Sequence, residues 1–108
     1  MPNVTIFIAE DSMPPDSVLA PLTARCAELC ATVLRAAPSN IHILYVGARH
    51  GAGHPAFVDV RYRLEPFRTP AVMARFMSGI DDAIRQLLGV TARIRCFGYA
   101  ANCIHAKH

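Results

Sequence analysis

The strongest constraint on the fold is a pattern of strand, helix and strand that occurs twice in the chain. The first copy covers residues 2–46 and the second covers residues 56–99 of the 108. A helix that connects two neighbouring strands in this way makes them parallel, with a right-handed crossover. We therefore expect one α+β domain over residues 1–108, in the order β-α-β-β-α-β, with a four-stranded sheet and both helices on one of its faces.

The first copy begins with a strand over residues 2–10, in which apolar side chains alternate along the sequence. The next segment contains two prolines and predicts a helix capped by Asp16 or Ser17. Pro38 is expected to end this helix, and residues 41–46 form the second strand. The helix should bury a stripe that consists of Val18, Leu22, Cys26, Leu29 and Val33.

The second copy has clearer boundaries. Alternation predicts a strand over residues 56–65. Thr69 is the expected helix cap, with Pro70 at the first helical position and Gly89 after the last one. The last strand is expected over residues 93–99. The buried stripe of this helix should be Val72, Phe76, Ile80, Ile84 and Leu87.

The sheet face away from the helices is expected to be polar. Charged residues make up 18% of the chain, against roughly 25% in an average domain, so their gathering on one face is notable. This face either contacts solvent or lines a polar channel inside an oligomer. The expected members are Asn3, Thr5, Asp59, Arg61, Arg63, Arg93 and Arg95.

Composition excludes several functional classes. The net charge of +3 is spread along the chain and forms no basic stripe, so we expect no nucleic-acid partner. No apolar run approaches the ~18 residues of a membrane span, and the start of the chain lacks the basic region of a signal peptide. A cytoplasmic protein is therefore expected. Ten of the 11 basic residues are arginines, which bind carboxylates through a planar fork, although a GC-rich genome gives the same bias.

The cysteines and histidines do not predict a metal site. The four cysteines contain no C-x-x-C pair, and the five histidines are scattered without acidic or thiol partners at helical spacing. We expect the cysteines to be small buried residues in a reducing compartment. No cofactor is expected.

Pro2 is the first candidate for catalysis. Removal of Met1 would leave a secondary amine at the start of a strand. An ordinary α-amino group has a pKa near ~7.7–8, and burial and nearby arginines would lower it, which gives a neutral base at physiological pH. If Met1 remains, the nitrogen of Pro2 is an amide and has no basicity.

Three further residues are candidates for binding an anionic substrate. Arg68 lies just before the second helix, where a guanidinium and the free N–H groups of the helix start could bind a carboxylate. His42 and Arg95 lie at equivalent points of the two copies. A solvated turn arginine and an ordinary strand histidine are the structural alternatives for Arg68 and His42.

Taken together, the Met-Pro start, the duplicated β-α-β pattern and the arginine before the second helix resemble the tautomerase superfamily. The resemblance runs from Pro2 to about Asn102. The segment 56–69 (AFVDVRYRLEPFRT) is similar to the third strand and following turn of the 5-carboxymethyl-2-hydroxymuconate isomerases. The tail segment Ala100-Ala101-Asn102 resembles the macrophage migration inhibitory factor branch.

This resemblance implies a function. Members of the superfamily use an amino-terminal proline as general base, transfer a proton between enol and keto forms without a cofactor, and form trimers of such subunits. Carried over to this sequence, Pro2 is the base, and Arg68, His42 and Arg95 bind a small carboxylate-bearing substrate. The implied reaction is tautomerisation of an unsaturated 2-keto acid, as in aromatic catabolism.

The sequence also departs from the superfamily pattern. Phe67-Arg68-Thr69 stands where Gly-Arg-Ser is frequent, and Ala92 stands where the migration inhibitory factor branch has an active-site tyrosine. A dehalogenase or decarboxylase of the same superfamily is an alternative, although no acid is evident beside Pro2. The alternative from another class is a non-catalytic ferredoxin-like binding module, which would have a different strand order.

Overall fold

A computed structural model describes residues 2–108 and confirms the β-α-β-β-α-β order. Short 3₁₀ turns follow β1, precede β2 and follow β4. The main elements are β1 (Asn3–Ala9), α1 (Asp16–Thr32), β2 (His42–Ala48), β3 (Ala56–Arg63), α2 (Pro70–Leu88) and β4 (Ala92–Tyr99).

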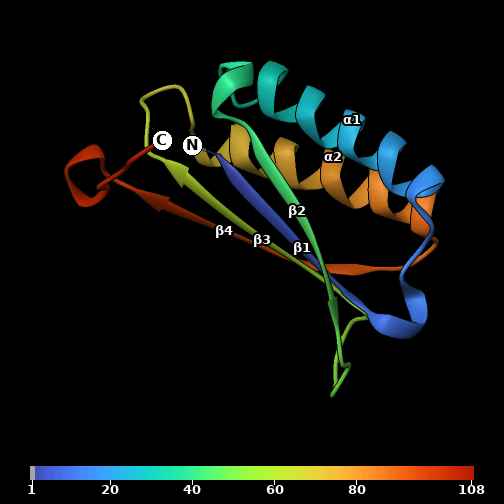
Figure 1. Cartoon of the computed structure of the whole chain (residues 1–108). Coiled ribbons are helices and arrows are strands. Elements are labelled where there is room, and N and C mark those ends of the chain that lie inside the picture. Colours follow the sequence, from blue (N-terminus) through green and yellow to red (C-terminus); the bar gives the residue numbers. More distant parts are fainter. Residues whose placement is uncertain (1) are drawn as a thin grey trace.

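The four strands form one sheet in the order β2-β1-β3-β4. β1 is parallel to β2, β3 is parallel to β4, and the two copies meet through the antiparallel pair β1 and β3. Both helices lie side by side on the same face of the sheet (Figure 1). Each helix thus connects neighbouring strands, whereas a split β-α-β unit of the ferredoxin-like type places another strand between them. The strand order therefore speaks against the ferredoxin-like alternative.

The core lies between the helices and the sheet. Phe76, Ile80 and Ile84 of α2 are fully buried as expected, while Val72 and Leu87 are only partly buried. Met73 and Ala83 are buried instead, because α2 also packs against α1 and its buried stripe is therefore wider than the sheet alone requires.

The buried stripe of α1 is shifted from the expected one. Leu22 and Cys26 are fully buried, and so is Cys30, which was not in the expected stripe. Leu29 is only partly buried and contacts α2, since a Cβ atom added at Gly79 would lie 2.7 Å from its terminal Cδ2. The glycine thus lets the two helices approach closely.

The end signals of α2 are confirmed. The Thr69 hydroxyl accepts a hydrogen bond from the backbone N–H of Val72 at 3.2 Å, Pro70 is the first helical residue, and Gly89 adopts φ 69° after the last turn. Left-handed backbone of this kind is easily adopted by glycine.

The predicted ends of α1 are wrong. Pro15 is the N-cap, without a side-chain bond, and its carbonyl accepts from the N–H groups of Val18 and Leu19, so neither Asp16 nor Ser17 is needed as a cap. The helix ends at Thr32, well before Pro38, because the chain turns through a left-handed residue at Arg35. The strand ends differ from the predictions by one or two residues.

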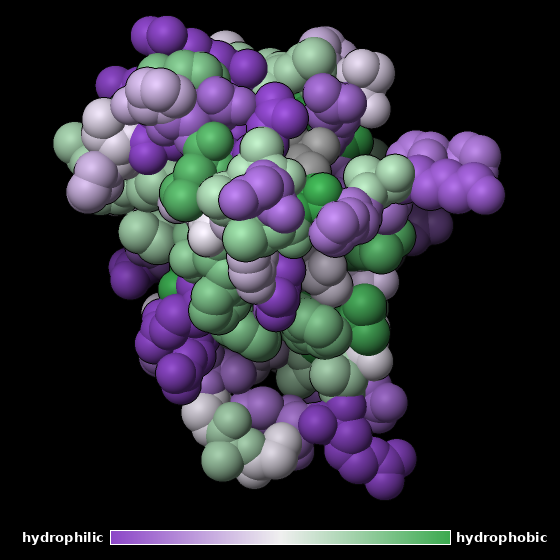
Figure 2. Space-filling view, turned by 90° about the vertical axis from the view of Figure 1, so that its left-hand side faces the viewer, coloured by the Kyte–Doolittle hydropathy of each residue, from purple (hydrophilic) through white to green (hydrophobic). Residues whose placement is uncertain are grey.

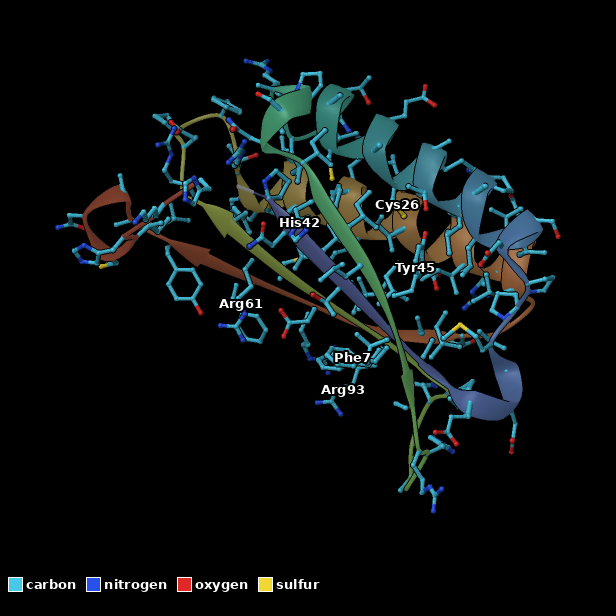
Figure 3. All side chains as sticks on the ribbon, in the orientation of Figure 1. Phe7, Cys26, His42, Tyr45, Arg61 and Arg93 are labelled. Carbon is cyan, nitrogen blue, oxygen red and sulfur yellow. The ribbon has the colours of Figure 1, made fainter. Side chains whose placement is uncertain are left out.

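The sheet face away from the helices, here called the open face, is less polar than expected. It carries the predicted charged residues, but Phe7 and Phe57 stack on it with ring centroids 6.0 Å apart, and Leu44 and Phe97 are 49% and 40% exposed. Figure 3 shows Phe7, Arg61 and Arg93 on this side and Cys26 and Tyr45 toward the helices. The alternation predicted for the strands β1 and β3 is confirmed, but apolar residues also occupy outward positions.

None of the helices in residues 2–108 is both long and apolar enough to cross a membrane.

Candidate functional site

The candidate site lies at the end of the sheet where β1 and β2 begin and where β3 and β4 end. Pro2 directly precedes β1, and its carbonyl accepts a hydrogen bond from the N–H of His42 at 3.1 Å. The turn between β3 and α2 and the carboxyl-terminal segment 101–108 lie at the same end (Figure 1). Figure 2 looks onto this end and shows hydrophilic residues around a largely hydrophobic centre.

One cavity at this end is strongly basic. It has a volume of ≈ 520 Å³ and is lined by the side chains of Arg35, Arg63 and Arg68, with Glu65 as its one carboxylate among the described residues. We call it the arginine cavity. Three guanidinium groups against one carboxylate leave an excess of positive charge, which favours an anionic ligand.

Arg68 is held in a fixed position within this cavity. Its Nε donates to the carbonyl of Leu34 at 3.0 Å, and its Nη1 donates to the carbonyl of Arg63 at 2.7 Å. These bonds connect the segment after α1 to the end of β3. Burial lowers the pKa of Arg68 from its ordinary value, and Glu65 opposes that change. Arg68 therefore differs from a solvated turn residue, and its remaining N–H groups are available to a ligand.

The ring of Phe67 contacts the guanidinium groups of Arg35 and Arg68. The Cζ atom of Arg35 lies 5.0 Å from the centroid of the Phe67 ring, and that of Arg68 lies 5.3 Å from it. Both distances are within the range of a cation–π interaction. Phe67 thus contacts both guanidinium groups at the cavity.

Sequence reasoning missed Arg35. It is a non-glycine residue with φ 53°, between the end of α1 and β2. Helices commonly end with one residue in left-handed backbone, which is usually a glycine. No glycine lies between α1 and Pro38, and this absence is the signal that another residue must adopt that conformation.

A second cavity of ≈ 720 Å³ lies beside the arginine cavity and is lined in part by the carboxyl-terminal residues; we call it the tail cavity. Asn3 and His42 line it, as do His105, Lys107 and His108. The two cavities share Asn40, Ile104 and Ala106, so they adjoin each other.

The structure brings three of the four predicted site residues to this end. Pro2 is fully buried and lines neither cavity, but its carbonyl is bonded to His42, which lines the tail cavity, while Arg68 lines the arginine cavity. Arg95 lies elsewhere. It is on the open face, paired in register with Asp59, and lines neither cavity.

The thiols of the buried Cys26 and Cys30 and of the half-buried Cys96 are poor nucleophiles. Burial raises the pKa of Cys26 to about 12 and those of Cys30 and Cys96 to about 11. A thiol reacts through its thiolate, so these groups remain inert near neutral pH. Among the described residues, no three histidine, cysteine or acidic side chains are grouped so that they could hold a metal ion.

No protein-family model and no curated protein sequence matches this chain. Solved structures are similar to it over nearly their whole length. The native fused 4-OT has a TM-score of 0.80 and 10% identity, covering 96% of this chain and 91% of that one. A macrophage migration inhibitory factor-like protein from Entamoeba histolytica has a TM-score of 0.78 and 13% identity, with 99% and 96% covered.

A third similar structure is a malonate semialdehyde decarboxylase, with a TM-score of 0.72 and 8% identity, covering 98% of this chain and 91% of that one. At these identities the likeness shows the fold. The chain therefore has the fold shared by a migration inhibitory factor-like protein, a 4-OT and a decarboxylase.

Proposed function

We propose that this protein is a cofactor-independent tautomerase of small unsaturated 2-keto acids, with Pro2 as the general base once Met1 has been removed. The observation that carries the proposal is the position of a proline directly before a central strand, at the same end of the sheet as a cavity with three arginines and one carboxylate. The fold supports it too, since the decarboxylase of the same fold was also solved as a variant in which its first residue, a proline, is replaced by alanine.

The chemistry follows from these groups. The secondary amine of Pro2 takes a proton from the enol hydroxyl, or from carbon, and returns it to a conjugated carbon of the same substrate. No net oxidation or cofactor is involved. The arginine cavity binds the carboxylate and stabilises the negative charge that develops on the enolate oxygen. Arg68 contributes its remaining N–H groups, and His42 lies on the side of the tail cavity.

A decarboxylase or dehalogenase is the second candidate. The observation that favours it is Glu65, a carboxylate that lines the arginine cavity and accepts a hydrogen bond from Arg63 at 3.0 Å. Such reactions need an acid or a water-activating carboxylate near the base. Because Glu65 is paired with Arg63, we favour the tautomerase, which needs no second carboxylate.

We propose that the protein is a homotrimer in which the open face is turned inward. Large apolar residues such as Leu44 and Phe97 lie on this face beside paired charges such as Arg61 and Asp59, which are 3.1 Å apart. Exposed apolar residues within one ordered face are typical of an interface between subunits. Arg95 would then line the inside of the oligomer.

The decisive test uses the amine of Pro2. Intact mass first establishes that Met1 is absent. The mature protein is then assayed by ultraviolet absorbance with 2-hydroxymuconate-type and phenylenolpyruvate-type dienols, beside a variant that carries one extra residue before Pro2. The extension converts the amine to an amide, so tautomerisation should fall by about 10²–10⁴-fold, the usual contribution of a general base. A Pro2→Ala variant keeps a primary amine and should retain part of the activity. Equal rates for the extended and mature proteins would refute the proposal.

A further inference from the structure

Arg35 has an unusual backbone conformation for its residue type. The N–H of Ala36 bonds to the carbonyl of Cys30 at 3.0 Å, and the turn that this bond closes after the helix contains Arg35 in left-handed backbone, with φ 53°. Glycine is the usual residue there because a Cβ atom disfavours this backbone. Strain of this kind is often found at functional sites, where the surrounding structure maintains it.

The side chain of Arg35 is the least engaged of the three guanidinium groups in the arginine cavity. Arg63 forms an ion pair with Glu65 at 3.0 Å, and Arg68 donates to two backbone carbonyls. Within residues 2–108, Arg35 forms no ion pair or hydrogen bond, and its ordering contact is the ring of Phe67 at 5.0 Å. Its N–H groups are therefore free to bind an anion.

The position of Arg35 depends on Arg68. The carbonyl that accepts from Arg68 Nε belongs to Leu34, the residue directly before Arg35. Arg68 thus holds the turn that carries Arg35, and both guanidinium groups contact the same ring of Phe67. The result is two adjacent positive charges, of which one is anchored to the backbone and the other is presented to the cavity.

We propose that Arg35 is a specificity-determining residue that binds the second carboxylate of a dicarboxylate substrate, and that Arg68, besides its own contact with the first carboxylate, positions Arg35 through the carbonyl of Leu34. The proposal rests on the proposed function, because the dicarboxylate is the substrate of that site. It explains why a helix end that glycine would form without strain carries an arginine.

The competing explanation is that the charge of Arg35 only stabilises the carboxyl end of α1. A positive charge near the carboxyl end of a helix interacts favourably with its dipole. That role is filled by any cation at this end and does not distinguish a dianion from a monoanion. Selectivity between two ligands of the same shape therefore separates the two explanations.

The test compares Arg35→Gly with the wild type and with Arg49→Gly as the matched control. Arg49 is an exposed loop arginine near the opposite end of the sheet, beyond β2. The probes are fumarate and crotonate, planar unsaturated acids with two carboxylates and one, whose dissociation constants are measured by NMR titration. Thermal unfolding is followed in parallel. Neither measurement requires turnover, so the result is independent of the Pro2 assay.

We expect Arg35→Gly to weaken fumarate binding about tenfold and crotonate binding less than threefold, since one charged hydrogen bond is lost. The melting temperature should stay the same or rise, because glycine relieves the strain. Arg35→Lys, which keeps the charge but loses the planar fork, should bind fumarate with intermediate affinity. Arg49→Gly should change neither constant.

Three results would overturn the inference: a wild type that does not prefer fumarate, an Arg35→Gly variant that keeps that preference, or equal weakening of both ligands with a lower melting temperature. The two proposals can fail separately. If the extension before Pro2 does not reduce activity but fumarate selectivity still depends on Arg35, the proposed catalysis is refuted and this binding site stands.

Discussion

Removal of the Arg68 side chain should destabilise the fold by an amount that can be worked from its contacts. Arg68→Ala loses the bond from Nε to the Leu34 carbonyl, the bond from Nη1 to the Arg63 carbonyl, and the contact with Phe67. A hydrogen bond from a charged group contributes about 1.5–3 kcal/mol. The bond to Arg63 is exposed, so water replaces most of it, whereas the bond to Leu34 is partly buried.

The expected loss in the free energy of unfolding is therefore about 2 kcal/mol, most of it from the Leu34 bond. For a domain of this size, 1 kcal/mol changes the melting temperature by roughly 4–8 °C, so a decrease of about 8–16 °C is expected. Urea and thermal unfolding followed by circular dichroism measure both quantities.

Arg63→Ala is the matched control. It removes a guanidinium from the same cavity, but its ion pair with Glu65 is solvent-exposed, and such pairs contribute about 0–1 kcal/mol. Arg68→Lys keeps the charge and cannot reproduce both bonds, so its stability should be intermediate. If Arg68→Ala is no less stable than Arg63→Ala, the bond to Leu34 does not hold the turn after α1, and the positioning role of Arg68 is lost.

Gly98→Ala should destabilise the protein by about 1–3 kcal/mol in urea unfolding, because its Cβ would lie 2.8 Å from Cζ of Tyr62, while Gly51→Ala, with open space around it, should change little. With a thiol reagent at pH 7–8, the exposed Cys103 should react rapidly, the half-buried Cys96 slowly because its pKa is raised to about 11, and the buried Cys26 and Cys30 only on unfolding; rapid labelling of Cys26 or Cys30 would contradict their burial. Folding raises the pKa values of Cys26, Cys30 and Cys96 above 9.0, so these thiols lose their protons at lower pH in the unfolded state than in the folded state. The free energy of unfolding should therefore decrease as the pH rises above about 9, and these groups should not affect it at lower pH. Light scattering should give a trimer mass for the wild type and a smaller species for Leu44→Asp on the open face; a wild-type monomer at all concentrations would refute the trimer.

Local sequence patterns predict the parts of the fold that depend on neighbours along the chain. The doubled β-α-β pattern follows from local periodicity, since alternation and helical spacing need no distant partner. The ends of α2 follow from Thr69 and Gly89, whose effects act within one turn. The ends of α1 were mispredicted because they depend on backbone conformation at Pro15 and Arg35, and side-chain capping preferences do not report it.

The candidate site depends on contacts between segments that are far apart in the sequence. The arginine cavity joins residues 35, 63, 67 and 68 with the carboxyl-terminal segment, and no local pattern brings these together. The sequence comparison of the two copies matched His42 with Arg95, and the strand registers show that this match is wrong. His42 is the first residue of β2, opposite Asn3, and its counterpart at the start of β4 is Ala92, opposite Ala56, whereas Arg95 lies in the middle of the edge strand β4. Which charges meet is set by strand order and register, and these are fixed by burial of the whole sheet against both helices.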